Sequence, residues 1–137
     1  ARLARIFRFV SAQIEQHRPD VLVVEDVFYG KNVQSLKSIG QVRGVIILAG
    51  ALAGVAVCEY SPREVKKAVV GRGDASKEQV QHMVMTVLGL AAPPEPHDAA
   101  DALALALCHS HRGTAIRDAA GRRGGIPTQL RELMKRK

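Results

Sequence analysis

The run Val21–Val24 constrains the fold of this 137-residue chain more than any other feature. Its residues are β-branched or apolar throughout, without polar alternation, which is typical of a strand buried on both faces. Such a strand needs helices on either side of its sheet. Apolar residues at helical spacing precede it over 3–14 and stop at Pro19, and residues 33–54 after it are typical of one long helix. We therefore expect an α/β layer fold.

In the second half of the chain, predicted strands and helices again follow one another. We expect a second strand over residues 55–60, and the sequences that start at Ser61 and Ser76 are typical of capping boxes. A short helix should therefore run to about Gly71, and an amphipathic helix should follow Ser76. A proline-rich connector then leads into an alanine-rich helix over about residues 97–112, which should lie against the sheet.

The composition favours a folded domain with a polyanionic partner. Hydrophobic residues make up 47% of the chain, and 20 Lys and Arg against 13 Asp and Glu give a formal net charge of +7. Nucleic acid is the first candidate partner and an anionic membrane surface the second. We take residues 1–112 as one domain and residues 113–137 as a basic C-terminal tail.

The longest apolar run covers residues 45–58. It is 14 residues long and includes several glycines. This is shorter than the roughly 18 residues of a spanning helix, so no membrane span is expected, and the apolar second half of the helix 33–54 should be core. The cysteines Cys58 and Cys108 have no partner motif, which indicates neither a zinc site nor a disulfide framework. A reducing cytoplasm is the expected location.

Three acids are candidates for a metal site. Glu25 ends the first strand, where open α/β sheets place functional groups, although an exposed strand-end acid explains it equally well. Asp98 and Asp101 are three residues apart and so share a helix face, although helix capping is the ordinary explanation for such a pair. If the fold brings the three carboxylates together, a hard divalent cation such as Mg²⁺ is the natural occupant.

Basic and aromatic residues near these acids are candidates for contacts with nucleic acid. Lys77 falls in the first turn of its helix, where a phosphate would be favoured, but a local pair with a neighbouring acid is the simpler interpretation. Lys66 could contact phosphate or belong to a solvated face. Phe28 lies in a loop with Lys31 and Asn32, where it could stack on an unpaired base or be buried.

Three segments carry a resemblance to a known family: VVEDVFYGKNVQSLKSIGQVRGV, REVKKAVVGRGDASKEQVQHMV and PHDAADALALALCH. From Ala1 to about Arg112 the chain closely resembles the RuvC-type Holliday-junction resolvases of bacteria. The resemblance implies a ribonuclease H-like fold with a mixed central sheet flanked by helices. It also implies a homodimer that nicks two strands symmetrically across a four-way DNA junction with Mg²⁺, in recombination and repair.

By motif, Glu25, Asp98 and Asp101 resemble three of the four catalytic acids of that family, which hold two Mg²⁺ ions, with Mn²⁺ as a substitute. Lys66 and Lys77 fall on positions that serve the junction backbone and cleavage. Phe28 falls on the loop aromatic near the crossover, with Lys31 and Asn32 beside it as DNA-binding candidates.

One part of the family pattern has no counterpart here. The first acid of the family lies in a Gly-x-Asp-x-Gly element on an opening strand, and we expect that acid and the opening antiparallel strands to precede Ala1. A non-catalytic junction-binding module is one alternative function, and a ribonuclease H-like nuclease acting on RNA is another. A branch-migration helicase complex at the bacterial nucleoid is the further partner that we expect.

Overall fold

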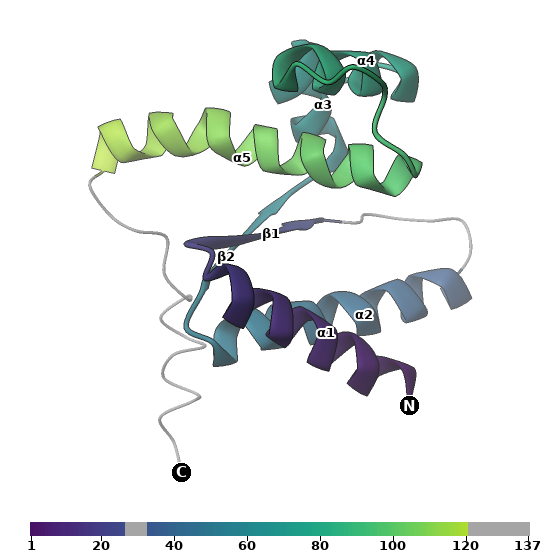
Figure 1. Cartoon of the computed structure of the whole chain (residues 1–137), viewed down its shortest axis with the longest axis vertical. Helices are drawn as coiled ribbons and strands as arrows, with labels where there is room; N and C mark the ends of the chain where they lie inside the picture. The colour runs from purple at the N-terminus through teal and green to yellow at the C-terminus, as the bar shows by residue number, and fades with distance from the viewer. Residues whose placement is uncertain (27–32, 121–137) are drawn as a thin grey trace. The chain divides into compact units, whose positions relative to one another are not determined.

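A computed structural model describes residues 1–26 and 33–120. Its helices and strands follow the predicted order (Figure 1). They are α1 (Arg2–His17), β1 (Val21–Glu25), α2 (Val33–Leu52), β2 (Ala56–Tyr60), α3 (Pro62–Val70), α4 (Lys77–Leu88) and α5 (His97–Ala120). Every predicted helix and strand is present, and the differences lie in the bounds of α5 and in the exposure of α2.

The two described strands pair in the order β1–β2, with α2 as the connection between them. The Asp26 N–H, just after β1, donates a 2.8 Å hydrogen bond to the carbonyl oxygen of Tyr60, the last residue of β2. The carboxyl ends of the strands therefore lie together, and a helical crossover between such strands is typical of parallel pairing. Glu25 stands at this shared edge.

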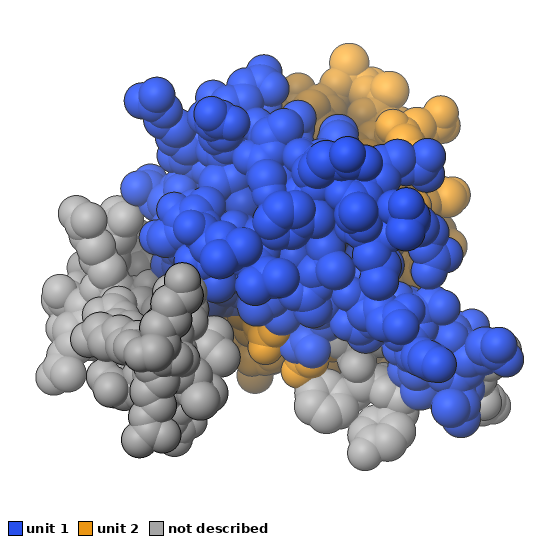
Figure 2. All heavy atoms as spheres, turned by 90° about the horizontal axis from the view of Figure 1, so that it is seen from below, with its two compact units in different colours: residues 1–24, 28–58, 123–137 blue, residues 25–27, 59–122 orange. Residues whose placement is uncertain are grey.

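The described residues divide into two compact units, coloured separately in Figure 2. Unit 1 contains residues 1–24 and 33–58, which include α1, α2 and the larger part of both strands. Unit 2 contains residues 25–26 and 59–120, which include the carboxyl ends of both strands and the helices α3, α4 and α5. All three candidate acids, together with Lys66 and Lys77, belong to unit 2.

Unit 1 is built on apolar packing of α1 against α2 and the strands. Its core cluster has three buried members with three partly buried side chains around them: Ile14, Ala49, Val55, Phe7, Val10 and Leu22. Gly50 shows how tightly α2 approaches the strands. A Cβ atom at Gly50 would lie 2.9 Å from Leu22 Cδ2 and 3.0 Å from Val57 Cγ2, so any larger residue there would force these side chains to shift.

The expectation that the apolar second half of α2 is core was too broad. Small residues at Ala49 and Ala51 are buried, but the side chains of Leu48 and Leu52 are 50% and 60% exposed. The reason is that α2 packs along one side only, and composition does not tell which side. Among the described residues, α2 is also the one helix long and apolar enough to cross a membrane by length and composition, a test that core helices of soluble proteins also pass. The expectation of no membrane span considered only the apolar run 45–58 and not the whole helix Val33–Leu52.

Unit 2 is a cluster of three helices with well-defined ends. Ser61 and Ser76 form the two predicted capping boxes, with Glu64 and Gln79 as the reciprocal partners. Gly71 and Gly89 end α3 and α4 in the left-handed conformation that favours glycine. The three helices pack on one another around fully buried Val84 and Cys108. These local sequence signals therefore set where α3 and α4 begin and end.

Helix α5 begins at His97, as predicted, so Asp98 lies inside its first turn and is not the N-cap residue, but its C-terminal end differs from the prediction. It continues beyond Arg112 to Ala120, because the alanine-rich sequence after Gly113 keeps helical conformation. The division into a domain at 1–112 and a tail at 113–137 stays a prediction.

Candidate active site

Glu25 is held at the carboxyl end of β1, and its environment disfavours the charged form. The residue is exposed, yet the protein around its carboxyl group removes enough water to raise its pKa, which is the largest cause of the shift. The negative charge of Asp101 raises the pKa of Glu25 further, and the positive charge of Lys77 lowers it. Asp101 and Lys77 therefore lie close enough to Glu25 to act on it electrostatically.

Asp98 and Asp101 lie on exposed positions of the first turns of α5. They are three residues apart and so share one helix face, as the sequence predicted. Within the described part of the chain, neither carboxylate takes part in a side-chain hydrogen bond or ion pair that would make it a capping group. The capping interpretation therefore loses its support, and Asp101 instead acts electrostatically on Glu25.

Lys77 is the first residue of α4, an exposed position where the helix dipole disfavours a cation. One partner in the simpler interpretation was Asp74, but Asp74 accepts two hydrogen bonds from Arg72, at 3.1 and 3.2 Å. Glu78 is the other, and its pKa is lowered first by its own backbone and by Ser76, with Lys77 as the smallest cause. Lys77 lowers the pKa of both Glu25 and Glu78, in each case as the smallest cause, so it lies near the candidate site as well as near its neighbour on α4.

The chemistry of these side chains fits a hard divalent cation. All the candidate ligands are carboxylate oxygens, which Mg²⁺ and Mn²⁺ prefer. A cation would favour the ionised form of Glu25, which burial and then the charge of Asp101 disfavour. Glu25 and Asp101 would hold it, with Asp98 one turn away on α5. Within residues 1–26 and 33–120, no three His, Cys, Asp or Glu side chains are already close enough to form a metal site.

The predicted DNA-binding residues are only partly covered by the structure. Phe28, Lys31 and Asn32 lie outside the described residues. Lys66 lies on α3 and is half-buried, and it is not among the charges that act on Glu25. Of the two lysines, the structure therefore brings Lys77 to the carboxylates.

Sequence reasoning missed a group of interacting side chains farther along α5 from the acids. The Tyr60 hydroxyl and His109 Nδ1 share a 2.8 Å hydrogen bond, and the Arg112 guanidinium lies 5.7 Å from the centroid of the Tyr60 ring. Arg112 also donates a 2.6 Å hydrogen bond to Glu64. No role could be assigned to His109 from the sequence, because it lies two residues from His111 and neither histidine belongs to a recognisable motif. Only the fold brings Tyr60 and His109 together.

Comparison with known proteins places the chain in a family. The family model described as "Crossover junction endodeoxyribonuclease RuvC" matches residues 1–109. A relative of that name from Syntrophomonas wolfei is 49% identical over 110 residues, which cover 80% of this chain and 64% of the relative. Another, from Chloroflexus aurantiacus, is 50% identical over 115 residues, which cover 84% of this chain and 70% of the relative. The chain thus spans about two thirds of the length of these curated relatives.

Solved structures agree with this result. The Thermus thermophilus RuvC structure matches with a TM-score of 0.78 and 37% identity, over 83% of this chain and 69% of that chain. A second structure, "T. thermophilus RuvC in complex with Holliday junction substrate", matches with a TM-score of 0.78 and 38% identity, over 82% of this chain and 68% of that chain.

Fold and site together define an α/β protein of the ribonuclease H-like fold, with Glu25 at the carboxyl end of β1 and within electrostatic reach of Asp101 on α5. The chain belongs to the RuvC family of crossover junction endodeoxyribonucleases.

Proposed function

We propose that the protein to which this chain belongs is a structure-selective endonuclease that resolves four-way DNA junctions by metal-dependent hydrolysis of phosphodiester bonds, in recombination and repair. The observation that carries the proposal is the electrostatic influence of Asp101 and Lys77 on Glu25 in a chain of the RuvC family. The junction complex of the Thermus thermophilus relative supports the choice of substrate.

In this proposal Glu25, Asp98 and Asp101 hold two Mg²⁺ ions, for which Mn²⁺ can substitute. When bound, such ions activate water for in-line attack and stabilise the leaving 3′-oxygen. The carboxylates do not need to transfer protons. Their role would be to hold the cations at the position of the reacting phosphate. Without a cation, burial of the Glu25 carboxyl group and then the negative charge of Asp101 disfavour its ionised form.

Lys77 has a separate task because it is a cation beside two acids. Its ammonium group stabilises the negative charge that develops on the scissile phosphate, and the N-terminus of α4 adds the positive end of a helix dipole. Lys66, half-buried on α3, contacts the DNA backbone away from the reacting atoms. Phe28, Lys31 and Asn32 contact the DNA near the crossover.

A homodimer suits this function because a four-way junction offers two equivalent strands, and a two-fold axis places one site on each. The exposed apolar side chains of α2, which include Leu48 and Leu52, are suited to such an interface. The formal net charge of +7 favours binding to the phosphate backbone, so affinity should fall steeply with salt. A branch-migration helicase complex at the nucleoid is the further partner.

A cleavage assay with the intact protein tests the proposal. Synthetic four-way junctions, linear duplexes and RNA–DNA hybrids are incubated with Mg²⁺ or Mn²⁺ and with EDTA, and the products are mapped to the nucleotide. We expect paired nicks at symmetry-related positions of the junction only, and none in EDTA. Cleavage of the RNA strand alone would assign the site to an RNA-directed nuclease, and tight junction binding without any nicking would assign it to a binding module.

A further inference from the structure

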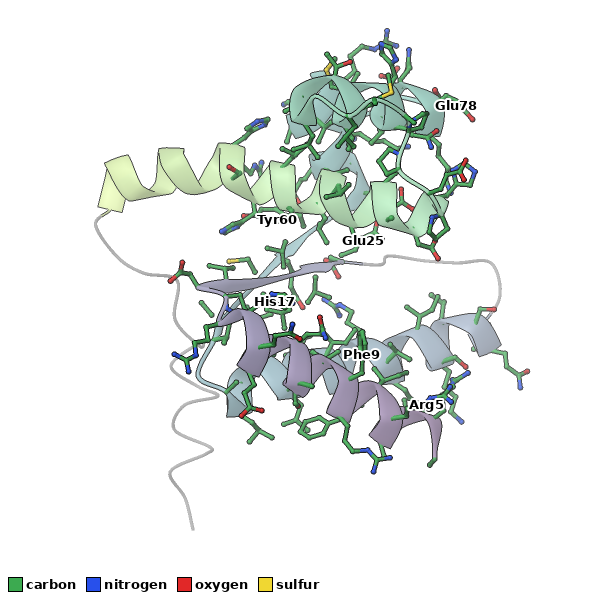
Figure 3. The ribbon with its side chains drawn as sticks, in the orientation of Figure 1. Arg5, Phe9, His17, Glu25, Tyr60 and Glu78 are labelled. Carbon is green, nitrogen blue, oxygen red and sulfur yellow. The ribbon has the colours of Figure 1, made fainter. Side chains whose placement is uncertain are left out.

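Tyr60 occupies an unusual position in unit 2, because its backbone and its side chain contact different parts of the candidate site. The residue is only 7% exposed. Its carbonyl oxygen accepts the 2.8 Å hydrogen bond from the N–H of Asp26, the residue directly after Glu25. The backbone of Tyr60 thus holds the end of β1 from which the Glu25 side chain projects, as can be followed in Figure 3, where both residues are labelled.

The side chain of Tyr60 reaches α5, the helix that carries the aspartates. Its hydroxyl shares the 2.8 Å hydrogen bond with Nδ1 of His109, and the two rings lie 5.8 Å apart between centroids at an angle of 51°. His109 and Asp101 are eight residues apart, which is about 12 Å along a helix. A contact at His109 therefore fixes the position of the rigid segment that bears Asp101.

Arg112 and Glu64 extend the same network to α3. The Arg112 guanidinium lies against the Tyr60 ring and donates a 2.6 Å hydrogen bond to Glu64 Oε1. Glu64 Oε2 accepts hydrogen bonds from the N–H and the hydroxyl of Ser61, both at 2.9 Å. Tyr60 is thus held on its ring face as well as at its hydroxyl, which leaves α5 little freedom to slide or rotate relative to β2.

We propose that Tyr60 and His109 are positioning residues that set the separation of Glu25 and Asp101. Tyr60 connects the backbone next to Glu25 with the helix that carries Asp101, through two hydrogen bonds of 2.8 Å. Neither residue touches the reacting atoms. The role in catalysis rests on the proposed nuclease function, whereas the effect on the carboxylate pair does not.

Small displacements are sufficient to matter at such a site. A misplacement of about 1 Å can cost on the order of 100-fold in rate when reacting groups must be aligned, and metal ligands tolerate even less error in distance. Loss of one half-buried hydrogen bond costs only a small part of the stability of a folded domain. A positioning role therefore predicts a larger effect on metal affinity and rate than on folding.

The test compares four variants of the intact protein with wild type. Tyr60→Phe removes only the hydroxyl, and His109→Leu removes the partner nitrogen. His109→Asn keeps a polar atom near the position of Nδ1 and is the rescue variant. His111→Ala is the matched control, because His111 is an exposed histidine of the same helix whose Nδ1 lies 3.3 Å from the carbonyl oxygen of Ala68.

Two quantities are measured: Mn²⁺ affinity by calorimetry without DNA, and the single-turnover rate of junction cleavage with enzyme in excess. We expect Tyr60→Phe and His109→Leu each to weaken Mn²⁺ binding about 5- to 10-fold and to slow cleavage on the order of 10- to 100-fold, with junction affinity unchanged. The double variant should be no worse than either single variant. His109→Asn should recover a large part of both losses, and His111→Ala should match wild type.

Wild-type Mn²⁺ affinity and cleavage in folded Tyr60→Phe would overturn the proposal, and that variant decides the question if His109→Leu does not fold. A loss confined to thermal stability would also overturn it. If wild-type protein fails to cut junctions while Tyr60→Phe still weakens Mn²⁺ binding, the positioning role stands and the proposed substrate is wrong. If wild type cuts junctions, and Mn²⁺ binding and cleavage by Tyr60→Phe are unchanged, the proposed function stands and the positioning role is wrong.

Discussion

Unit 1 and unit 2 use the same α/β sequence pattern but are stabilised in different ways. Unit 1 is organised around aliphatic side chains and a helix–strand approach so close that a Cβ atom at Gly50 would displace its neighbours. Unit 2 has two capping boxes, an ion pair between Glu64 and Arg112, and a tyrosine–histidine hydrogen bond. It also contains every candidate acid.

This difference teaches where the chain can tolerate change. Apolar packing is sensitive to volume and insensitive to pH and metal, because it depends on removing apolar surface from water. A polar network around ionisable groups responds to charge, pH and cations instead. Variants in unit 1 should therefore alter stability alone, and variants around Glu25 should alter function with little loss of stability.

The largest expected effect is on cleavage, from Asp101→Asn in unit 2. The substitution keeps the shape of the side chain and removes its charge, so junction cleavage should fall by on the order of 1,000-fold or more while junction affinity stays within about two-fold. Asp98→Asn should act in the same direction. Single-turnover cleavage and a binding assay in Ca²⁺ measure the two quantities.

Asp74→Asn is the matched control for this comparison, because Asp74 is an exposed acid of the same unit that pairs with Arg72. It should cleave at the wild-type rate. Wild-type cleavage by Asp101→Asn would remove Asp101 from the site, and an equal loss in Asp74→Asn would show that the effect is not specific to the candidate ligands.

In unit 1 the sharpest test is a pair of glycine substitutions in α2. Gly50→Ala should destabilise the fold by about 1–3 kcal/mol, because the new Cβ would lie within 3.0 Å of Leu22 and Val57. Gly44→Ala meets no atom within 4 Å and should be neutral or stabilising by up to about 1 kcal/mol through helix propensity. Urea denaturation measures both. Equal effects of the two substitutions would contradict the described packing of α2.

The stability contributed by Glu64 should depend on pH, which distinguishes the polar network of unit 2 from the apolar packing of unit 1. Hydrogen bonds from the Ser61 backbone, from Arg112 and from the Ser61 hydroxyl lower the pKa of Glu64 to about 2. An acid with a lowered folded-state pKa stabilises the protein above its unfolded pKa near 4.5, and this stabilisation is lost as the pH falls toward 2.

Wild type should therefore exceed Glu64→Gln in unfolding free energy by about 1 kcal/mol or less at pH 7, a modest value because the side chain is 40% exposed. The gap should close between pH 4.5 and pH 2. Denaturation curves at pH 7, 4 and 3 measure it. A gap that does not change with pH would show that ionised Glu64 is not the source of the stabilisation.

The smallest expected effect on stability is that of Glu25. Its ionised form destabilises the folded protein, whereas the ionised form of Glu64 stabilises it. The raised pKa of Glu25 means that the ionised form is disfavoured in the folded protein, so stability is lost as the pH rises through the folded-state pKa. Glu25→Gln should therefore stabilise the metal-free protein at pH 7 by about 0.5 kcal/mol, a value kept small by solvent screening at an exposed group.

Differential scanning calorimetry in EDTA measures this gain, with Glu15→Gln, an exposed acid of α1, as the control. The gain should disappear below pH 4.5, where Glu25 is protonated in both states. A destabilised Glu25→Gln protein at pH 7 in EDTA would contradict the electrostatic description of the site.

Local signals explain how far the sequence could predict this structure. The capping boxes at Ser61 and Ser76 and the strand before Glu25 were predicted correctly, because each depends on residues within a few positions. The exposure of Leu48 and Leu52 was not, because an almost uniformly apolar helix has no periodicity to show which side is covered.

The site was predictable in part for the same reason. Asp98 and Asp101 are neighbours on any helix, and the family resemblance joined them to Glu25. The bond between Tyr60 and His109 joins residues 49 positions apart. A tyrosine at a strand end and a histidine on an alanine-rich helix carry no motif, so this contact could be found only from the fold.

The central claim is that Glu25 and Asp101 form one cation-binding site, and Mn²⁺ titration of the intact protein tests it most directly. Calorimetry without DNA should show saturable binding to wild type and to Asp74→Asn, and at least about a 10-fold loss of affinity in both Glu25→Gln and Asp101→Asn. Undiminished Mn²⁺ affinity in either of these two variants would contradict the account.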